Sequence, residues 1–261
     1  SSVIDLSRVK SLVIDEADRM LSMGFIPDVK AIIGRTLKKE KRQTQLFSAT
    51  LSEDIRRLAA SWTIDPIRVA IEPEQVAVDS VEQFVYLTSE GDKYKLLYNI
   101  LSKENPDRVI VFVNRRDHAR ELEDHLYRNG FNCGLLTGEV PQRKRLKTLD
   151  AFKTGKIQIL VATDVAGRGI HVDDISHVVN YNLPEDPEDY VHRIGRTGRA
   201  GATGISISLA CENDSFMLPN IEQLLGTPLP CNVPPGHLLE EPLPPERKSR
   251  EQPRRKQRPR R

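Results

Sequence analysis

The chain has 261 residues, 38% of them hydrophobic and 29% charged, which is long enough for one or two domains with hydrophobic cores. It contains no run of about 18 apolar residues and its start does not resemble a signal peptide, so no membrane-spanning helix is expected. Cys133, Cys211 and Cys231 form no Cys-x-x-Cys pair, so we expect neither a disulfide framework nor a zinc site, and a reducing cytoplasm fits.

The net charge of +2 is unevenly distributed, because the end of the chain is cationic and the rest is acidic. Residues 246–261 hold nine Lys or Arg and two Glu, a net charge of +7, which leaves about −5 on the rest of the chain. We expect residues 227–261 to form a Pro/Arg-rich disordered basic tail. Such a tail is typical of polyanion binding, with nucleic acid as the first candidate, and a purely solubilising role is the alternative.

Short apolar runs alternate with helical stretches, a pattern typical of α/β proteins with a parallel sheet. In residues 1–72 we expect strands at Val9–Ile14, Gln45–Phe47 and Ile67–Ile71 and helices at Pro27–Leu37 and Ser52–Trp62. Ser52 is the expected N-cap of its helix. Residues 73–80 lack any periodicity and are interpreted as a linker.

Residues 81–226 carry the more complete pattern. Strands are expected at Val81–Leu87, Arg108–Val113, Cys133–Leu136, Gln158–Ala162, His177–Tyr181 and Ile205–Leu209, and helices at Lys93–Lys103, Arg116–Arg128, Pro141–Phe152, Pro187–Arg193 and Asn213–Leu225. Six strands with helical crossovers predict one complete doubly wound domain, whereas residues 1–72 supply only part of another. The chain has no G-x-x-x-x-G-K-[ST] phosphate loop, since its one Gly-Lys pair is followed by Ile157.

Two carboxylates follow the first apolar strand directly. Asp15 and Glu16 are therefore expected at the carboxyl edge of a parallel sheet, where ligands bind in open α/β folds. Asp15 is placed to hold Mg²⁺ through its water shell, and Glu16 to orient and deprotonate an attacking water. Ser48 and Thr50 end the next strand, and their hydroxyl groups can hydrogen-bond the carboxylates.

The stretch His192–Arg199 carries two guanidinium groups close behind glycines. Arg196 and Arg199 are three residues apart, and we expect them to share one face of a short helix that Tyr190 and Val191 anchor. Guanidinium groups suit the spread negative charge of a phosphoryl group. For this stretch alone, a solvated basic turn is the alternative.

Taken together, these motifs resemble the DEAD-box ATP-dependent RNA helicases, in the order and at the spacing of that family. The resemblance extends from about Val9 to Leu225 and is carried by Asp15–Asp18, Ser48–Thr50, Val109–Asn114, Thr137–Gly138, Gln142–Arg145, Ala162–Gly169 and His192–Arg199. It implies RecA-like parallel sheets with helices on both faces: a partial first domain and one complete C-terminal domain. Leu209–Glu212, Gly169–His171 and the basic tail look like the bacterial RhlB-type subgroup, which joins RNA-degrading assemblies.

The resemblance also implies a role for individual residues. Asp15 and Glu16 would handle Mg²⁺ and the hydrolytic water, and Arg196 and Arg199 would reach the γ-phosphate as arginine fingers. Coupling of nucleotide state to duplex separation would involve Asp18, Ser48, Thr50, Arg168 and His192. ATP would also contact Asp164, through its ribose, and Gly167. RNA would lie along Arg115, Thr137, Gly138, Gln142, Arg145 and Thr163.

Some of these positions have simpler interpretations. Asp164 follows a strand and could cap a helix, and Gln142 and Arg145 could belong to an exposed helix face. The wider family usually has Asp at His171 and Ala at Gly167. The glycine is expected to make its loop more pliable.

We therefore expect an ATP-dependent RNA helicase that couples ATP hydrolysis to local RNA duplex unwinding, with ATP and Mg²⁺ as cofactors. RNA is the expected partner, and an endoribonuclease scaffold of an RNA degradosome is a candidate protein partner. The expected process is bacterial RNA degradation in the cytoplasm. Because the chain lacks a phosphate loop and begins without Met, we expect a fragment that is inactive as an ATPase alone. The alternatives are a non-catalytic docking module for RNA or protein and a DNA-directed motor. An upstream phosphate loop would favour the motor, and the Asp-Glu-Ala-Asp sequence with His192 favours RNA over DNA.

Overall fold

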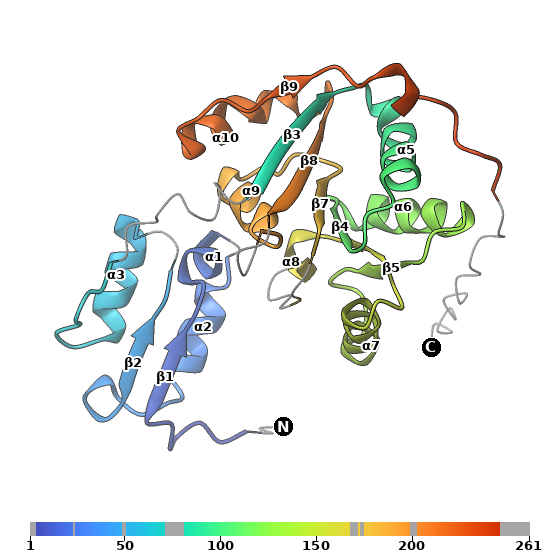
Figure 1. Ribbon diagram of the computed structural model, residues 1–261. Coiled ribbons are helices and arrows are strands. Elements are labelled where there is room, and N and C mark those ends of the chain that lie inside the picture. Colours follow the sequence, from blue (N-terminus) through green and yellow to red (C-terminus); the bar gives the residue numbers. More distant parts are fainter. Residues whose placement is uncertain are drawn as a thin grey trace, which may run out of the picture. The chain divides into compact units, whose positions relative to one another are not determined.

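The computed structural model describes residues 4–22, 24–48, 51–70, 81–167, 172, 175–198 and 203–245. It divides the chain into two compact units, Ser1–Glu72 and Pro73–Arg261 (Figure 1). Thr50, Arg168 and Arg199, to which the sequence assigns roles, lie outside the described residues. Within them, no helix is long and apolar enough to cross a membrane.

The first unit is a two-stranded parallel sheet packed against helices. Strands β1 (Ser11–Ile14) and β2 (Gln43–Leu46) pair, and helices α1 (Ala17–Ser22), α2 (Ile26–Ile33) and α3 (Glu53–Trp62) accompany them, with a 3₁₀ turn η1 at Lys39–Lys41. Its small core holds Ile14, Ala17, Ile55 and Trp62. Val13 points away from Ile14, as alternation along a strand requires, and is 57% exposed. The opposite face of this small sheet therefore leaves apolar surface uncovered.

Ser52 caps α3 as expected, because its hydroxyl oxygen accepts a hydrogen bond from the backbone N–H of Ile55 at 3.4 Å. The third strand expected at Ile67–Ile71 is wrong for the described residues 67–70, which form no strand. Ile67 is 93% exposed and Val69 80% exposed. Apolar alternation is not sufficient for a strand, because an extended segment that pairs with no neighbour gains no ladder hydrogen bonds.

The second unit is built on a seven-stranded parallel sheet with the strand order β5-β6-β4-β7-β8-β3-β9. The strands are β3 (Val81–Leu87), β4 (Val109–Phe112), β5 (Cys133–Leu136), β6 (Ile159–Ala162), β7 (His177–Asn180), β8 (Gly204–Ala210) and β9 (Cys231–Asn232). Every pairing between neighbours is parallel. The interior strand β4 is buried along its whole length, as a parallel strand covered on both faces should be.

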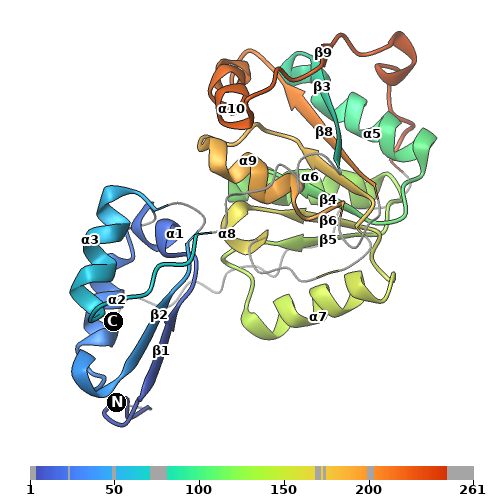
Figure 2. The same cartoon turned by 60° about the vertical axis from the view of Figure 1, so that its left-hand side comes forward.

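Helices cover both faces of this sheet (Figure 2). They are α5 (Lys93–Glu104), α6 (Arg116–Arg128), α7 (Gln142–Lys153), α8 (Asp164–Gly167), α9 (Pro187–Ile194) and α10 (Leu218–Leu225), with 3₁₀ turns η2 (Glu90–Asp92), η3 (Ser215–Met217) and η4 (Gly236–Leu238). Val109 and Val111 of β4 face α5 and α6, whereas Ile110 and Phe112 face α7 and α8. This arrangement confirms the predicted α/β class with helices on both sides of a parallel sheet.

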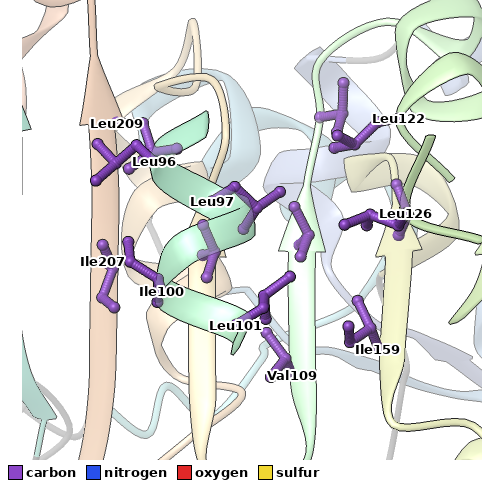
Figure 3. Packing of buried hydrophobic residues seen from close by; sticks show 14 of the residues in the cluster. Leu96, Leu97, Ile100, Leu101, Val109, Leu122, Leu126, Ile159, Ile207 and Leu209 are labelled. Atoms are coloured by element: carbon purple, nitrogen blue, oxygen red, sulfur yellow. The ribbon is translucent and has the colours of Figure 1, made fainter. Parts of the chain in front are cut away.

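The core beneath α5 shows why that helix forms and stays in place. Leu96, Leu97, Ile100 and Leu101 recur at helical spacing and point at the sheet (Figure 3). None of the four is more than 3% exposed. Burying each such side chain is worth about 1.5–3 kcal/mol. The helix ends at Glu104, and the next residue, Asn105, takes the left-handed conformation that commonly follows the end of a helix.

The last part of the described chain returns across the domain, and we refer to residues 229–245 as the C-terminal strap. Its β9 pairs with β3, and Leu238 enters the core against α5. Asn99 donates hydrogen bonds to the carbonyls of Leu238 at 3.1 Å and Glu240 at 2.8 Å. The prediction of a disordered tail from residue 227 is therefore wrong up to residue 245. The proline-rich composition suggested disorder, but the segment pairs with β3 at the edge of the sheet. Proline, which has no N–H group, is tolerated at such an edge.

Candidate functional site

The carboxylates predicted after the first strand lie at the carboxyl end of β1. The backbone N–H of Glu16 donates to Oδ1 of Asp15 at 2.9 Å, and both residues are exposed. Glu16 has φ +50°, a left-handed conformation that costs a residue with a side chain about 1–2 kcal/mol. Strain of this kind is concentrated at functional sites, where the surroundings hold it in place. Here it turns the chain sharply between β1 and α1 and leaves both carboxylates accessible.

The end of β2 holds this turn in place. The N–H of Phe47 donates to the carbonyl of Ile14 at 2.8 Å, and the N–H of Ala17 donates to the carbonyl of Phe47 at 3.0 Å. Ser48 follows, and its hydroxyl oxygen accepts from the N–H of Asp18 at 3.2 Å. The structure therefore brings Ser48 to the Asp-Glu-Ala-Asp segment, through a backbone N–H and not through the side chains that we expected.

The chemistry of these groups fits a weakly held Mg²⁺ ion. Asp15 and Glu16 offer hard carboxylate oxygens at an accessible strand end, and Mg²⁺ is commonly held by one or two carboxylates while it keeps several waters. Among the described residues, no group of three or more His, Cys, Asp or Glu side chains could enclose a metal ion. A fully protein-ligated metal centre is therefore not built from the described residues.

In the second unit, the side chain of Arg193 organises the carboxyl ends of three strands. Arg193 is 1% exposed and donates to both oxygens of Asp164, from Nε at 2.6 Å and from Nη2 at 2.7 Å. It also donates to Oδ1 of Asn114 at 2.8 Å and to the carbonyl of Asn182 at 2.7 Å. Its guanidinium carbon stands 5.2 Å from the ring centroid of Phe112, within range of a cation–π interaction. One buried cation thus ties α9 to the segments that follow β4, β6 and β7.

Helix α9 begins with a strong local signal. The side chain of Asp186 accepts from the N–H of Glu188 at 3.0 Å, and Pro187 occupies the first turn. The apolar anchor expected at Tyr190 is confirmed, since its side chain is fully buried and its hydroxyl donates to Oε1 of Gln83 at 2.8 Å. Burial raises the pKa of Tyr190 to about 12.

Helix α9 ends at Ile194, so Arg196 does not continue the face that we expected it to share with Arg199. Gly195 closes the helix, and Nε of Arg196 donates to the carbonyl of His192 at 3.1 Å. The turn that follows is packed tightly. Thr197 is buried and bonds to the carbonyls of Ile175 and Ser176, and a Cβ on Gly204 would lie 2.4 Å from the backbone nitrogen of Gly198. Glycine is required at 204 for this approach.

Two residues predicted to contact ATP have defined surroundings. Both oxygens of Asp164 are engaged by Arg193, so a ribose contact at Asp164 stays a prediction. Gly167 is buried at the end of α8, where an added Cβ would meet Cε1 of Phe112 at 2.6 Å. This glycine therefore permits close packing of α8 on the sheet, a physical reason that differs from the pliability we expected.

Residues predicted to contact RNA follow the carboxyl ends of β4, β5 and β6. Gly138 and Gln142 are exposed, whereas Thr137 and Thr163 are buried. Two arginines of the set already have partners within the domain. Arg115 pairs with Asp117, whose pKa it lowers, and Nη2 of Arg145 donates to the carbonyl of Ala166 at 2.8 Å.

Comparison with known protein families gives a match in each of the two units. The model of the DEAD/DEAH box helicase domain matches residues 1–58, and the model of the helicase conserved C-terminal domain matches residues 92–201. The chain belongs to the DEAD-box helicase family. The predicted family is therefore confirmed, and the two matches fall in the two compact units.

Among curated proteins, this helicase chain is similar to the ATP-dependent RNA helicase RhlB of Pseudomonas aeruginosa, with 58% identity over 236 residues. That match covers 90% of this chain and 59% of the relative. RhlB of Shewanella frigidimarina is 45% identical over 252 residues, covering 96% of this chain and 58% of the relative. The resemblance to the RhlB-type subgroup is thus confirmed, and the chain spans somewhat more than half the length of these relatives.

Solved structures of DEAD-box helicases share the fold. Saccharomyces cerevisiae Dbp5 bound to RNA and ADP BeF3 aligns with a TM-score of 0.76 and 30% identity, over 88% of this chain and 61% of that one. Escherichia coli SrmB bound to the regulator of ribonuclease activity A aligns with a TM-score of 0.57 and 35% identity, over 66% of this chain and 98% of that one. The RecA-like fold is therefore confirmed.

Arg193 is not among the residues to which the sequence assigned a role. It stands between His192 and Ile194, and its partners lie up to 79 residues away in the chain. Helical spacing gave a usable signal, since Tyr190 and Arg193 lie on one buried face of α9. An arginine on a buried face requires anionic or carbonyl partners.

Proposed function

We propose that the protein of which this chain forms part is an ATP-dependent RNA helicase that couples ATP hydrolysis to local RNA duplex unwinding. The observation that carries the proposal is the 58% identity with a protein named as such, together with motif residues at strand ends in both units. DNA is less favoured as the substrate because the relatives are named as RNA helicases.

In the proposed reaction, Asp15 and Glu16 would hold a hydrated Mg²⁺ and orient the attacking water, and Arg196 and Arg199 would stabilise charge on the γ-phosphate. Mg²⁺ would neutralise part of the phosphate charge when bound. Coupling of this chemistry to RNA is assigned to Asp18, Ser48, Thr50, Arg168 and His192. The nucleotide would also be contacted by Asp164 and Gly167. Support comes from the exposed carboxylates after β1 and from the way Arg193 fixes the helix that precedes Arg196.

RNA is proposed to lie along Arg115, Thr137, Gly138, Gln142, Arg145 and Thr163. Contacts of this kind to phosphates and 2′-hydroxyl groups carry little sequence information, so general unwinding is expected. Exposure of Gly138 and Gln142 supports direct contact. Arg145, which is bonded to the carbonyl of Ala166, would act partly by holding α8.

The chain itself is proposed to be inactive as an ATPase because its 261 residues include no phosphate loop. Phosphate release from ATP should stay at background with and without single-stranded RNA. When the same chain follows a first domain that supplies a phosphate loop, RNA should stimulate turnover more than DNA does. Arg196→Ala in that protein should then lower turnover by about 10³-fold or more. Substantial turnover by the 261-residue chain would refute the proposed inactivity, and stimulation by DNA alone would refute the RNA assignment.

We further propose a place in bacterial RNA degradation, in the cytoplasm, with an endoribonuclease scaffold as partner. This rests on the similarity to the RhlB-type subgroup. Pull-down with the whole chain and with a chain ending at residue 245 separates binding by the cationic residues 246–261 from binding by the domain. A scaffold retained by neither chain would count against the partner.

A further inference from the structure

An open groove follows the free edge of the second unit's sheet. Strand β5 is the outermost strand on that side, and its residues Cys133, Gly134 and Leu135 line the floor of the groove. Helices α6 and α7 lie on opposite faces of the sheet (Figure 2). Residues of both helices line the groove and form its two walls. The groove has a volume of about 570 Å³, and the motif residue Thr137 lies at one end of it. Apart from that end, the nucleotide and RNA roles proposed above leave the groove unused.

The floor of this groove presents main-chain groups that the sheet does not use. On β5 and its preceding residue, the carbonyls of Asn132 and Leu136 accept from Ile159 and Thr163 on the β6 side, at 3.1 and 3.2 Å. Since the hydrogen-bonding direction alternates along a strand, the N–H and C=O of Leu135 point the other way, into the groove. A strand edge of this kind is a template for pairing with another extended chain.

The two walls differ in charge. Lys144 on α7 and Lys156 just beyond it both line the groove and are exposed, and neither forms an ion pair with any residue that the structure describes. On the α6 wall, Arg120 is held by Glu139 at 2.7 Å, and Glu123 and Asp124 add carboxylates. The α7 wall is therefore positive, and the α6 wall offers no surplus positive charge.

We propose that this groove binds an extended protein segment that adds to the sheet as a strand beside β5 and carries a carboxylate at every second residue. Successive side chains of a strand point to opposite faces, so one set meets the α7 wall and the other the α6 wall. The acidic set pairs with Lys144 and Lys156, small neutral residues pack beside Asp124, and the main chain bonds to Leu135. An RNA strand fits less well, because it offers no amide ladder and its phosphates would approach the carboxylates of α6.

The test uses the whole 261-residue chain and two synthetic ten-residue peptides, one alternating Glu and Thr and the other alternating Lys and Thr. Fluorescence anisotropy should show about tenfold tighter binding of the Glu peptide, which corresponds to the contribution of two surface ion pairs, one at Lys144 and one at Lys156. The Glu peptide should also shift the backbone amide signal of Leu135 in an NMR titration and slow its hydrogen exchange. The double substitution Lys144→Glu with Lys156→Glu should reverse the preference in favour of the Lys peptide.

The matched control is Lys147→Glu with Lys153→Glu, which makes the same charge change on exposed positions of α7 outside the groove. It should leave the preference for the Glu peptide intact. The proposal is overturned if the control reverses the preference as well, if the groove variant does not, or if binding leaves the Leu135 amide unchanged. A ten-nucleotide single-stranded RNA that competes with the Glu peptide and shifts the same amide would also overturn it, in favour of an RNA groove.

Discussion

Replacing Arg193 with alanine should destabilise the second unit severely. The side chain is 1% exposed and donates to Asp164, Asn114 and Asn182, and its removal leaves a carboxylate only 22% exposed without its cation. Removing one partner of a buried, hydrogen-bonded ion pair costs about 3–5 kcal/mol. For a slope of about 2 kcal/mol per molar urea, the unfolding midpoint should fall by about 2 M. Circular dichroism would follow this transition, because most of the helices belong to the second unit.

The single tryptophan provides an internal reference for this experiment. Trp62 is buried in the core of the first unit, so its fluorescence reports on that unit alone. Arg143→Ala, at an exposed position of α7, should change stability by no more than about 0.5 kcal/mol. Combining Arg193→Ala with Asp164→Ala should cost less than the sum of the two single changes. A cost below about 1 kcal/mol for Arg193→Ala would refute the view that this residue holds the strand ends together.

Three further predictions concern packing, pH and capping. Gly167→Ala should destabilise the second unit by about 1–3 kcal/mol in the urea assay, because the new methyl group meets the ring of Phe112. Gly138→Ala is the control and should leave stability unchanged, because a methyl group there meets no atom within 4 Å. Burial lowers the pKa of His177 below its usual 6.5, so the folded state favours the neutral ring. The free energy of unfolding should therefore fall as the pH drops from about 7.5 toward 5.5. His177→Gln should flatten that part of the pH profile of stability, and a profile that keeps its slope would contradict the role given to His177. Ser52→Ala should cost the first unit about 1 kcal/mol by Trp62 fluorescence, and Ser52→Asp should retain the cap.

The parts of the fold that depend on local pattern were predictable from the sequence. Continuous apolar runs such as Val109–Phe112 located the buried parallel strands, and the helices between them followed from apolar spacing such as Ala119, Leu122 and Leu126. A helix at α8 was expected only as the alternative in which Asp164 caps a helix, and the ordered C-terminal strap was not predicted. A single turn is too short to show periodicity, and the strap is held by long-range contacts such as the Asn99 bonds.

The candidate site, like the fold, was predictable from the sequence only in part. Motif residues could be named because the order of the motifs is specific, and their positions at strand ends followed from the parallel topology. What the sequence could not give was their bonding within the domain. Asp164 and Arg145 both turned out to have partners that lie more than 20 residues away. Such pairings arise only when the strands are assembled, and no local pattern encodes them.

The two-residue strand β9 has a consequence for self-association of the second unit. β9 pairs only with Val85 and Tyr86 of the seven-residue β3, so it shortens the backbone edge that β3 can offer to another chain. Among the strands that the structure describes, β5 at the other side of this sheet has no such cover. Edge-to-edge joining of two copies is therefore favoured at β5 over β3.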